Sequence, residues 1–337
     1  MKQKRKSSPA RTAMKLLCTV LGLILAVMLG VTVFVQYLLG QINYVDSDDT
    51  TLLSQLELDK ILGSSSQNSG DVSFDSHNTQ IGGRGSPVVN ILLIGQDRRE
   101  NESRARSDSM ILCTFNKQTK QLIMTSFLRD LYVEIPGYHS NRINAAYAAG
   151  GMSLLDKTLE KNFGVYIDGN VEVDFNQFAD IVDLLGGVEI ELRQDEAAFI
   201  NEETGSTLSQ GVHTLNGDQA LAYTRIRKLD ADGDFSRTNR QRKVISALLD
   251  AYKGSNLTTV LSLVTKILPM ITTDMNSIEL MGHALELFPM LSGAELVSQR
   301  VPADGMYTNQ TIDGMAVLVA DMDATREMLE RTLLDSE

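Results

Sequence analysis

The sequence contains no tryptophan and only two cysteines in 337 residues. Cys18 lies in an apolar segment near the amino terminus, and Cys113 lies in an apolar run typical of a strand, so the two thiols cannot form a disulfide framework. We interpret Cys113 as a core residue rather than a nucleophile. The four histidines are scattered without the spacing of zinc ligands, and the chain has no Walker loop. Composition therefore favours neither thiol, zinc nor P-loop chemistry.

Basic residues are also scarce, with 31 Lys and Arg against 43 Asp and Glu, for a net charge of −12. An acidic chain lacks the basic face that nucleic acid requires, so we expect no nucleic-acid partner. Seven basic residues nevertheless lie between Leu221 and Lys243. Like charges at this density repel unless they lie on a solvated face or converge on an anion. We interpret this segment as an anion-binding element.

One long segment lacks charge altogether. Residues 16–39 would extend over roughly 36 Å as a helix, which exceeds the ~30 Å hydrocarbon core of a bilayer. A cleaved signal peptide is the alternative, but its apolar region is shorter and no Ala-x-Ala site follows Leu39. Six basic residues precede the segment and Asp46, Asp48 and Asp49 follow it. We therefore predict a cytoplasmic basic tail (1–15), one transmembrane helix (16–39) and an extracellular remainder anchored in the cell membrane.

Residues 40–86 contain a segment rich in Ser, Gly, Asn and Asp and are predicted to form an extracellular linker. An extracellular domain is predicted over 87–335. Its first apolar runs, 88–95, 110–115 and 122–127, are typical of strands, and a short polar link predicts a hairpin between the last two. If the first two also pair antiparallel, Asp97, Asp108 and Arg129 meet at one edge of the sheet.

Paired carboxylates on strand ends suit Mg²⁺, which takes oxygen ligands and retains several waters. We therefore predict a metal site at Asp97 and Asp108. The alternative for each single Asp is a turn or helix-capping role.

The rest of the domain alternates strands and helices. A strand, a helix over 175–185 and another strand follow one another, with Phe175, Phe178 and Ile181 in an apolar stripe. Apolar helices are also predicted over 257–268 and 277–291, lining either a cavity or the core. This pattern predicts an α/β fold in which a mixed central sheet is flanked by helices, an αβα sandwich.

A long helix is predicted from Asp234 or Ser236 to about Lys253. Arg237 and Gln241 are one turn apart on it and point the same way. Free N–H groups at the start of the helix favour an anion there. Asp230, Asp232 and Asp234 are interpreted as turn and cap residues rather than metal ligands.

Several motifs occur in a diagnostic order: IGQD at 94–97, RSDSM at 106–110, TSFLRD at 125–130, RINAAYAAGG at 142–151, and YTRIRK at 223–228 leading to DGDFSRTNRQR. In this combination the sequence resembles the LytR-CpsA-Psr (LCP) family of bacterial envelope proteins. The motifs match over residues 88 to about 334. Outside them, members of the family resemble this chain in having a short cytoplasmic tail, one membrane helix and an external α/β domain.

The resemblance implies a phosphotransferase that moves an anionic or capsular glycopolymer, such as teichoic acid or capsule, from undecaprenyl-pyrophosphate to peptidoglycan, onto the N-acetylmuramic acid 6-hydroxyl. Asp97 and Asp108 would hold Mg²⁺, with Mn²⁺ as the alternative ion. The residues expected to contact the pyrophosphate are Arg129, Arg142, Arg225, Arg227, Arg237 and Gln241. Catalysis is expected to depend on Asp97, Arg129, Arg225 and Arg227.

Two positions depart from the family pattern: Leu128 stands where Pro is common, and Arg142 stands where Lys is common. Arg for Lys replaces a point donor with a planar fork. Asp97 is also the expected acceptor of the hydroxyl proton. Metal ligation lowers its proton affinity, so water or another group is the alternative base.

Two other functions use the same residues. A lipid-sensing regulator would bind the polyprenyl pyrophosphate without turnover. A hydrolase would cleave it with water as the acceptor.

Overall fold

The computed structural model describes residues 40, 43–45, 80–96, 107–291 and 293–334. The predicted tail 1–15 and membrane span 16–39 lie outside these residues, as does most of the predicted linker. No helix within the described ranges is long and apolar enough to cross a membrane.

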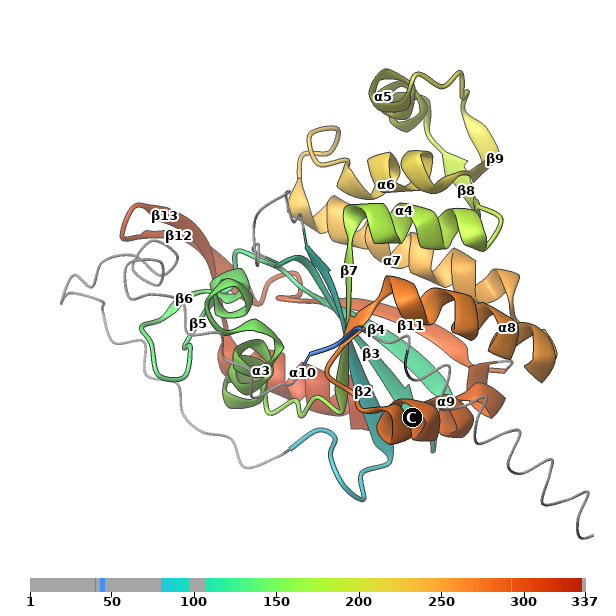
Figure 1. The fold of residues 1–337 in the computed structure, drawn as a ribbon. Coiled ribbons are helices and arrows are strands. Elements are labelled where there is room, and N and C mark those ends of the chain that lie inside the picture. Colours follow the sequence, from blue (N-terminus) through green and yellow to red (C-terminus); the bar gives the residue numbers. More distant parts are fainter. Residues whose placement is uncertain (1–39, 41–42, 46–79, 97–106, 292, 335–337) are drawn as a thin grey trace, which may run out of the picture. The chain divides into compact units, whose positions relative to one another are not determined.

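A seven-stranded mixed sheet is the centre of the fold (Figure 1). Across the sheet its strands are β1 (Asn43–Tyr44), β10 (Thr272–Thr273), β7 (Gly169–Asp174), β2 (Val88–Gln96), β3 (Ser107–Asn116), β4 (Gln121–Phe127) and β11 (Glu295–Val301). β3 and β4 form the predicted antiparallel hairpin. β2 also pairs antiparallel with β3, which is the condition under which the strand ends meet at one edge. β7 pairs parallel with β2, and β11 pairs parallel with β4. β1, which falls within the predicted linker, pairs with β10.

Helices cover both faces of this sheet (Figure 1). One face carries α3 (Ile143–Phe163) and α10 (Met322–Leu334). The other carries α4 (Phe175–Leu184), α7 (Asp234–Ala251), α8 (Leu257–Ile267) and α9 (Ser277–Leu291), with a short 3-10 turn η1 (Leu268–Met270) after α8. The predicted α/β class, a mixed sheet flanked by helices, is confirmed.

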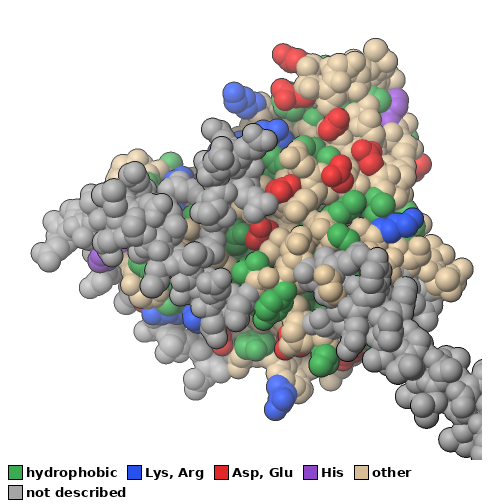
Figure 2. Space-filling view, in the orientation of Figure 1, with side chains coloured by type: hydrophobic (Ala, Val, Ile, Leu, Met, Phe, Trp, Pro, Cys, Tyr) green, Lys and Arg blue, Asp and Glu red, His purple; other side chains and the backbone are tan. Residues whose placement is uncertain are grey.

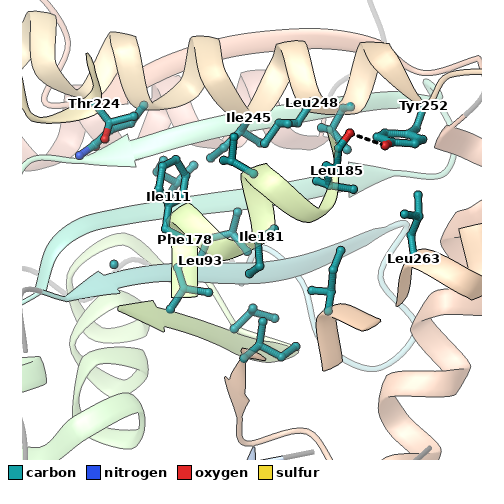
Figure 3. A pocket seen from close by; sticks show the side chains of 18 of the residues that line it. Leu93, Ile111, Phe178, Ile181, Leu185, Thr224, Ile245, Leu248, Tyr252 and Leu263 are labelled. Carbon is teal, nitrogen blue, oxygen red and sulfur yellow. Dashed lines mark hydrogen bonds between the residues drawn. The ribbon is translucent and has the colours of Figure 1, made fainter. Parts of the chain in front are cut away.

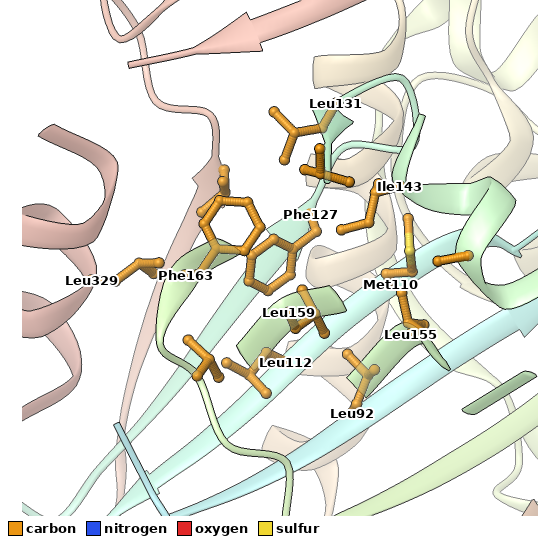
Figure 4. Packing of buried hydrophobic residues seen from close by; sticks show 14 of the residues in the cluster. Leu92, Met110, Leu112, Phe127, Leu131, Ile143, Leu155, Leu159, Phe163 and Leu329 are labelled. Atoms are coloured by element: carbon orange, nitrogen blue, oxygen red, sulfur yellow. The ribbon is translucent and has the colours of Figure 1, made fainter. Parts of the chain in front are cut away.

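The core follows from strand alternation, because successive side chains point to opposite faces. Leu92 and Ile94 of β2 are buried on the α3 face, among Phe127, Phe163 and Leu329 (Figure 4). The Phe127 and Phe163 rings pack with centroids 5.2 Å apart. Leu93 points to the opposite face (Figure 3).

A small lobe consists of α4, α5 (Gln194–Thr204), α6 (Gly217–Arg225) and the antiparallel pair β8 (Val188–Leu192) and β9 (Gly211–Leu215). Its apolar side chains form a separate buried cluster that includes Ile190, Ile200 and Tyr223. The strand, helix and strand order predicted for this region is present. β8, however, pairs only with β9 and is not part of the central sheet.

Helix α3 begins at Ile143, with Arg142 as its N-cap. The backbone leaves helical geometry at Gly150 and Gly151, where Gly151 has φ +64°. Glycine accepts this positive φ at little cost, so α3 consists of two helical segments joined by a kink at Gly150 and Gly151. Two further two-stranded sheets are β5 (Tyr132–Val133) with β6 (Asn141–Arg142), and β12 (Tyr307–Ile312) with β13 (Met315–Ala320).

Candidate active site

The predicted meeting of strand ends at one sheet edge is present. Gln96, the last residue of β2, pairs with Ser107 at the start of β3, and β4 ends beside them at Phe127. Arg129 follows β4 and donates a hydrogen bond from Nη1 to Oδ1 of Asp108, at 2.7 Å. Asp97 directly follows Gln96 and lies outside the described residues.

Helix α7 brings the basic segment to the same edge. Its N-cap is Gly233, with φ +51°, and not an aspartate or serine side chain. The Ser236 hydroxyl instead donates to Asp232 at 2.6 Å. Arg237 Nη2 donates to the backbone carbonyl of Asp108 at 3.2 Å, which joins α7 to β3.

Asp234 was predicted to cap helix α7, but its side chain has a different role. Its Oδ2 accepts hydrogen bonds from Arg129 Nε at 3.0 Å and Arg237 Nη2 at 3.2 Å. Its Oδ1 lies 2.7 Å from Nε of Arg227. The carboxylate is therefore an internal counterion for three guanidinium groups. The sequence signal for this role is the three-residue spacing of Asp234 and Arg237, which puts both on one face of the helix.

Burial and neighbouring charge act differently on Arg237, which is buried, and on Arg129, which is partly buried. Burial lowers the pKa of Arg237, and the cations Arg129 and Arg227 add to this effect, against the attraction of Asp234. Burial also disfavours the charged form of Arg129, but Asp234, Asp108 and Asp130 outweigh it and raise its pKa. An additional anion beside Arg237 would therefore be stabilised by a cation that is incompletely neutralised.

These side chains line a polar cavity of about 200 Å³. Its lining comprises Gly95, Asp108, Ser109, Arg129, Phe175, Thr224, Arg225, Arg227, Arg237 and Gln241. Arg225, at the end of α6, lies over the Phe175 ring at 4.9 Å. Gln241 accepts a hydrogen bond from the Ser109 hydroxyl at 3.1 Å. Four guanidinium groups and one carboxylate in the lining make this cavity suitable for an anion with several oxygens.

Arg142 lies close to this cavity but is not part of its lining. Its Nη1 donates to Oδ1 of Asp130 at 3.1 Å, and Arg129 Nε lies 3.9 Å from the other oxygen of the same carboxylate. Arg142 is thus linked to the arginine cluster through Asp130.

Two arginines of the basic segment hold α7 in place. Arg240 is buried and pairs with Glu196 of α5 and with Asp230. Arg242 donates to the hydroxyls of Ser126 on β4 and Ser298 on β11, both at 2.6 Å. Burial lowers the pKa of Arg242 to about 10, and Arg300 adds to the effect. Three of the seven basic residues between Leu221 and Lys243 line the polar cavity: Arg225, Arg227 and Arg237.

A second, apolar cavity of about 500 Å³ adjoins the polar one and shares Gly95, Ser109, Phe175, Thr224 and Gln241 with it. Its walls come from the sheet, α4, α7 and α8, and Figure 3 shows Leu93, Phe178, Ile181, Ile245 and Leu263 around it. At one wall the Tyr252 hydroxyl donates to the Leu185 carbonyl at 2.7 Å. The apolar stripe of α4 and the helix predicted over 257–268 are thus cavity walls, whereas none of the described side chains of α9 is part of the lining.

Gly95 stands where the two cavities meet. A Cβ atom at this position would lie 3.1 Å from Cβ of Ser109. That distance is tighter than ordinary van der Waals contact, so a side chain here would narrow the passage between the cavities. The glycine of the IGQD motif thus keeps the two cavities continuous.

The described residues contain no group of three or more His, Cys, Asp or Glu side chains arranged to hold a metal ion. Among the residues that the structure describes, Asp108 alone supplies a carboxylate to the lining of the polar cavity. This arrangement fits an ion that takes one or two carboxylates and obtains its other ligands from water and phosphate, as Mg²⁺ does.

The chain is similar to teichoic acid transferases. It is 37% identical over 228 residues to the polyisoprenyl-teichoic acid–peptidoglycan teichoic acid transferase TagT of Bacillus subtilis (strain 168), over 60% of this chain and 70% of that protein. It is 38% identical over 162 residues to the regulatory protein MsrR of Staphylococcus aureus (strain COL), over 48% of each.

Solved structures give the same result. The structure of the LytR-CPS2A-psr family protein YwtF (TagT) with bound octaprenyl pyrophosphate lipid superimposes with a TM-score of 0.57 at 28% identity, over 74% of this chain and 91% of that one. The LytR_cpsA_psr family model matches residues 59–333. The chain therefore belongs to the LytR_cpsA_psr family.

Proposed function

We propose that this protein transfers an anionic or capsular glycopolymer from undecaprenyl-pyrophosphate to peptidoglycan, at the N-acetylmuramic acid 6-hydroxyl. Membership of its family makes the chain an enzyme of the transferase class. The observation that carries the proposal is the continuity of an arginine-lined cavity with an apolar one. A polyprenyl pyrophosphate has the same two parts, a charged head and an apolar tail.

The arginine cluster would act on the head group. In the reaction the acceptor hydroxyl oxygen bonds to the phosphorus that carries the glycopolymer, and the bond from that phosphorus to the polyprenyl phosphate breaks. The products are a phosphodiester between polymer and glycan strand, undecaprenyl phosphate, and the proton of the hydroxyl, with Asp97 as its proposed acceptor. Arg129, Arg225 and Arg227 would stabilise negative charge on the phosphate oxygens, since guanidinium forks bind such oxygens in pairs.

The Asp234 carboxylate would compete with the substrate for the arginine cluster. In the structure its carboxylate occupies the contacts of Arg129, Arg227 and Arg237 that an incoming phosphate would need. Phosphate oxygens would compete with Asp234 for these N–H donors. The internal counterion thus keeps the cluster organised before the substrate arrives.

A divalent ion completes the proposal. Asp108 and Asp97 would hold Mg²⁺, or Mn²⁺ as the alternative. When bound, the ion would supply neutralisation of the pyrophosphate charge. The support in this structure is the position of the Asp108 carboxylate in the cavity lining.

Binding without turnover is the second candidate, favoured by the likeness to a protein named as a regulator. Product analysis separates the functions. The full-length protein in detergent receives lipid-linked polymer and peptidoglycan, with Arg237→Ala as the inactive comparison and Lys228→Ala, an exposed residue outside the cavity lining, as the matched control. Polymer joined to glycan strands supports transfer, free polymer supports hydrolysis, and unchanged lipid supports binding alone. A panel of teichoic and capsular donors identifies the polymer.

A further inference from the structure

Helix α9 exposes large apolar side chains on its outer surface. Ile278 is 84% exposed and Leu285 is 58% exposed. They are seven residues apart, two helical turns, so they lie on the same side of the helix. On the inner side Leu287 packs against Val89 and Ile91 of β2. The exposed part of α9 also carries Glu279 and Glu286, and Glu286 pairs with Lys117 at 3.1 Å. Ile278 and Leu285 themselves belong to no apolar cluster of the described residues.

Strand β1 follows the predicted membrane span by only a few residues in the chain. β1 pairs with β10, and β10 lies between α8 and α9 in the chain. The predicted span ends at Leu39, and the four residue steps from there to Asn43 extend over at most about 14 Å. Tyr44 is 52% exposed, and Val45 beside it is also exposed. Exposed apolar residues thus begin where the predicted span ends.

The apolar cavity reaches the same region. Ile267 and Ile271 are part of its lining, and Ile271 directly precedes β10. The arginines are at the other end, beyond Gly95 and Gln241. A prenyl chain extending away from the arginine cluster would therefore point toward β10 and its partner β1.

Charge on the rest of the surface favours the same orientation. Residues 172–218, which form most of the small lobe, contain eleven Asp and Glu and a single Arg. Figure 2 shows acidic side chains gathered over this part of the molecule. Residues 253–291, which include α8 and α9, are nearly balanced, with two Lys against three Asp and Glu. Anionic headgroups would repel the small lobe and leave the region of α9 as the side that approaches lipid.

We infer that the outer side of α9, with Ile278 and Leu285, together with Tyr44 and Val45, docks in the interfacial region of the bilayer. This docking surface orients the apolar cavity so that the prenyl chain enters it from the membrane without crossing water. The entry of the prenyl chain from the membrane rests on the proposed function, whereas the docking of α9 does not.

Site-specific fluorescence tests the docking surface in the full-length protein, reconstituted in vesicles of equal parts phosphatidylcholine and phosphatidylglycerol. An environment-sensitive NBD label is attached to Ile278→Cys or Leu285→Cys in a Cys18→Ser background. Burial raises the pKa of the Cys113 thiol to about 12, so this cysteine does not compete for the label. Val212→Cys on β9 is the matched control, because Val212 is 59% exposed and lies in the acidic lobe.

We expect doxyl-labelled lipids to quench the label at 278 and 285 at least about twofold, and to leave the label at 212 unchanged. Equal quenching at all three positions, or none at 278 and 285, would overturn the docking surface. A blue shift at 278 without lipid quenching, together with disulfide cross-linking between labelled positions of two molecules, would assign the surface to a second copy of the chain and also overturn it.

A double variant, Ile278→Asp with Leu285→Asp, tests the consequence for activity. Transfer from a bilayer-embedded donor should fall roughly tenfold or more, because two charged residues oppose insertion. Transfer from a short-chain donor in detergent should be unchanged, since neither residue lines the cavities. Equal loss in both assays overturns the inference. Absence of transfer in the wild-type protein would reject the proposed function while the quenching result still decides the docking surface.

Discussion

Arg129 and Asp234 are 105 residues apart in the chain and are joined by a hydrogen bond of 3.0 Å from Nε to Oδ2. Arg129 follows strand β4 and Asp234 begins helix α7, so this contact connects the sheet to the basic segment. The contact also brings the guanidinium group of Arg129 to those of Arg227 and Arg237. Five predictions follow from this arrangement and its surroundings.

Replacing Asp234 with Asn should destabilise the free protein by roughly 3–5 kcal/mol, because the buried Arg237 and its neighbours lose their counterion. Inorganic pyrophosphate should then raise the melting temperature more in the variant than in the wild type, since no carboxylate competes for the arginines. Differential scanning fluorimetry measures both effects. Asp230→Asn, which removes a partner of Arg240 outside the cavity, should destabilise without enlarging the pyrophosphate effect. Identical pyrophosphate shifts in Asp234→Asn and the wild type would contradict this role.

Arg227→Ala should reduce the rate of transfer by about 10- to 150-fold, the loss of roughly 1.5–3 kcal/mol from one charge-assisted contact. Folding should be preserved, because the Arg227 side chain is half-exposed. Circular dichroism checks the fold and a single-turnover assay checks the rate. Lys228→Ala provides a neighbouring basic residue outside the cavity lining, for which we expect no change. Unchanged transfer in a folded Arg227→Ala variant would remove this residue from the mechanism.

Asp108→Ala should abolish the dependence of turnover on Mg²⁺. It also removes the 2.7 Å contact to Arg129, so the activity measured without added metal should fall as well. A titration of rate against Mg²⁺ concentration distinguishes these effects. Loss of the metal site removes the rise of the rate with Mg²⁺, whereas loss of the Arg129 contact lowers the rate at every Mg²⁺ concentration. A normal titration midpoint in the variant would show that Asp108 is no metal ligand.

Filling the apolar cavity should weaken binding of the prenyl chain without affecting binding of the pyrophosphate group. Leu263→Trp places a large ring inside the cavity and should weaken binding of a long polyprenyl pyrophosphate by about tenfold or more. Inorganic pyrophosphate should bind with unchanged affinity, because Leu263 is not in the polar lining. Thr258→Trp on the exposed side of the same helix is the control. Calorimetry with both ligands measures the difference, and parallel losses for both would argue against separate subsites.

Asp156→Asn should stabilise the protein in a pH-dependent way. Asp156 accepts a hydrogen bond from Asn170 at 2.8 Å, and its Oδ1 is buried without a partner. Burial raises the pKa of Asp156 to about 8, and Asp274 and Glu160 add to the effect against Asn170 and Lys157. The folded pKa lies above the unfolded value, so the protonated carboxyl favours folding at low pH and this contribution is lost as pH rises from about 4 to 8.

The Asn variant is already neutral, so its advantage should be on the order of a few kcal/mol at pH 8 and should vanish near pH 4. Urea unfolding across this pH range measures the difference between variant and wild type. Asp180→Asn, on the exposed side of α4, is the matched control. A pH-independent difference at position 156 would mean that the carboxyl is ionised in the fold.

Local pattern was sufficient to identify strands β2, β3 and β4 and the β3–β4 hairpin, because apolar runs and a short polar link determine a hairpin within a few residues. It also placed Asp108 and Arg129 at one edge. The pairing of β2 with β3, across a longer connection, was an assumption rather than a prediction. The pairing of β11 with β4 was not predictable from local pattern, because the paired residues lie far apart in the chain. Gln121 and Glu295, for example, are 174 residues apart. Pairing between distant strands leaves no local periodicity to detect.

The role of Asp234 was missed for a different reason, and the apolar cavity was only one of two alternatives for the helices predicted over 257–268 and 277–291. An aspartate in the first turn of a helix satisfies the same local rules whether it caps the helix or binds arginine. The stripe that includes Phe178 and Ile181 has the same spacing whether it packs against other side chains or lines a cavity, because both environments exclude water. Only the positions of the facing elements distinguish the two.

The order of strands in the central sheet has a consequence for how the protein folds. Both outer pairings of the sheet join segments far apart in the chain, β1 with β10 and β4 with β11. Neither pairing can form until most of the chain is available. The conformational entropy of closing a long loop is therefore lost before the hydrogen bonds of the outer strands are gained. The β2–β4 meander can form early, and the sheet edges are then completed by residues beyond 270. Folding should therefore be slow and should depend on the carboxyl-terminal third of the chain.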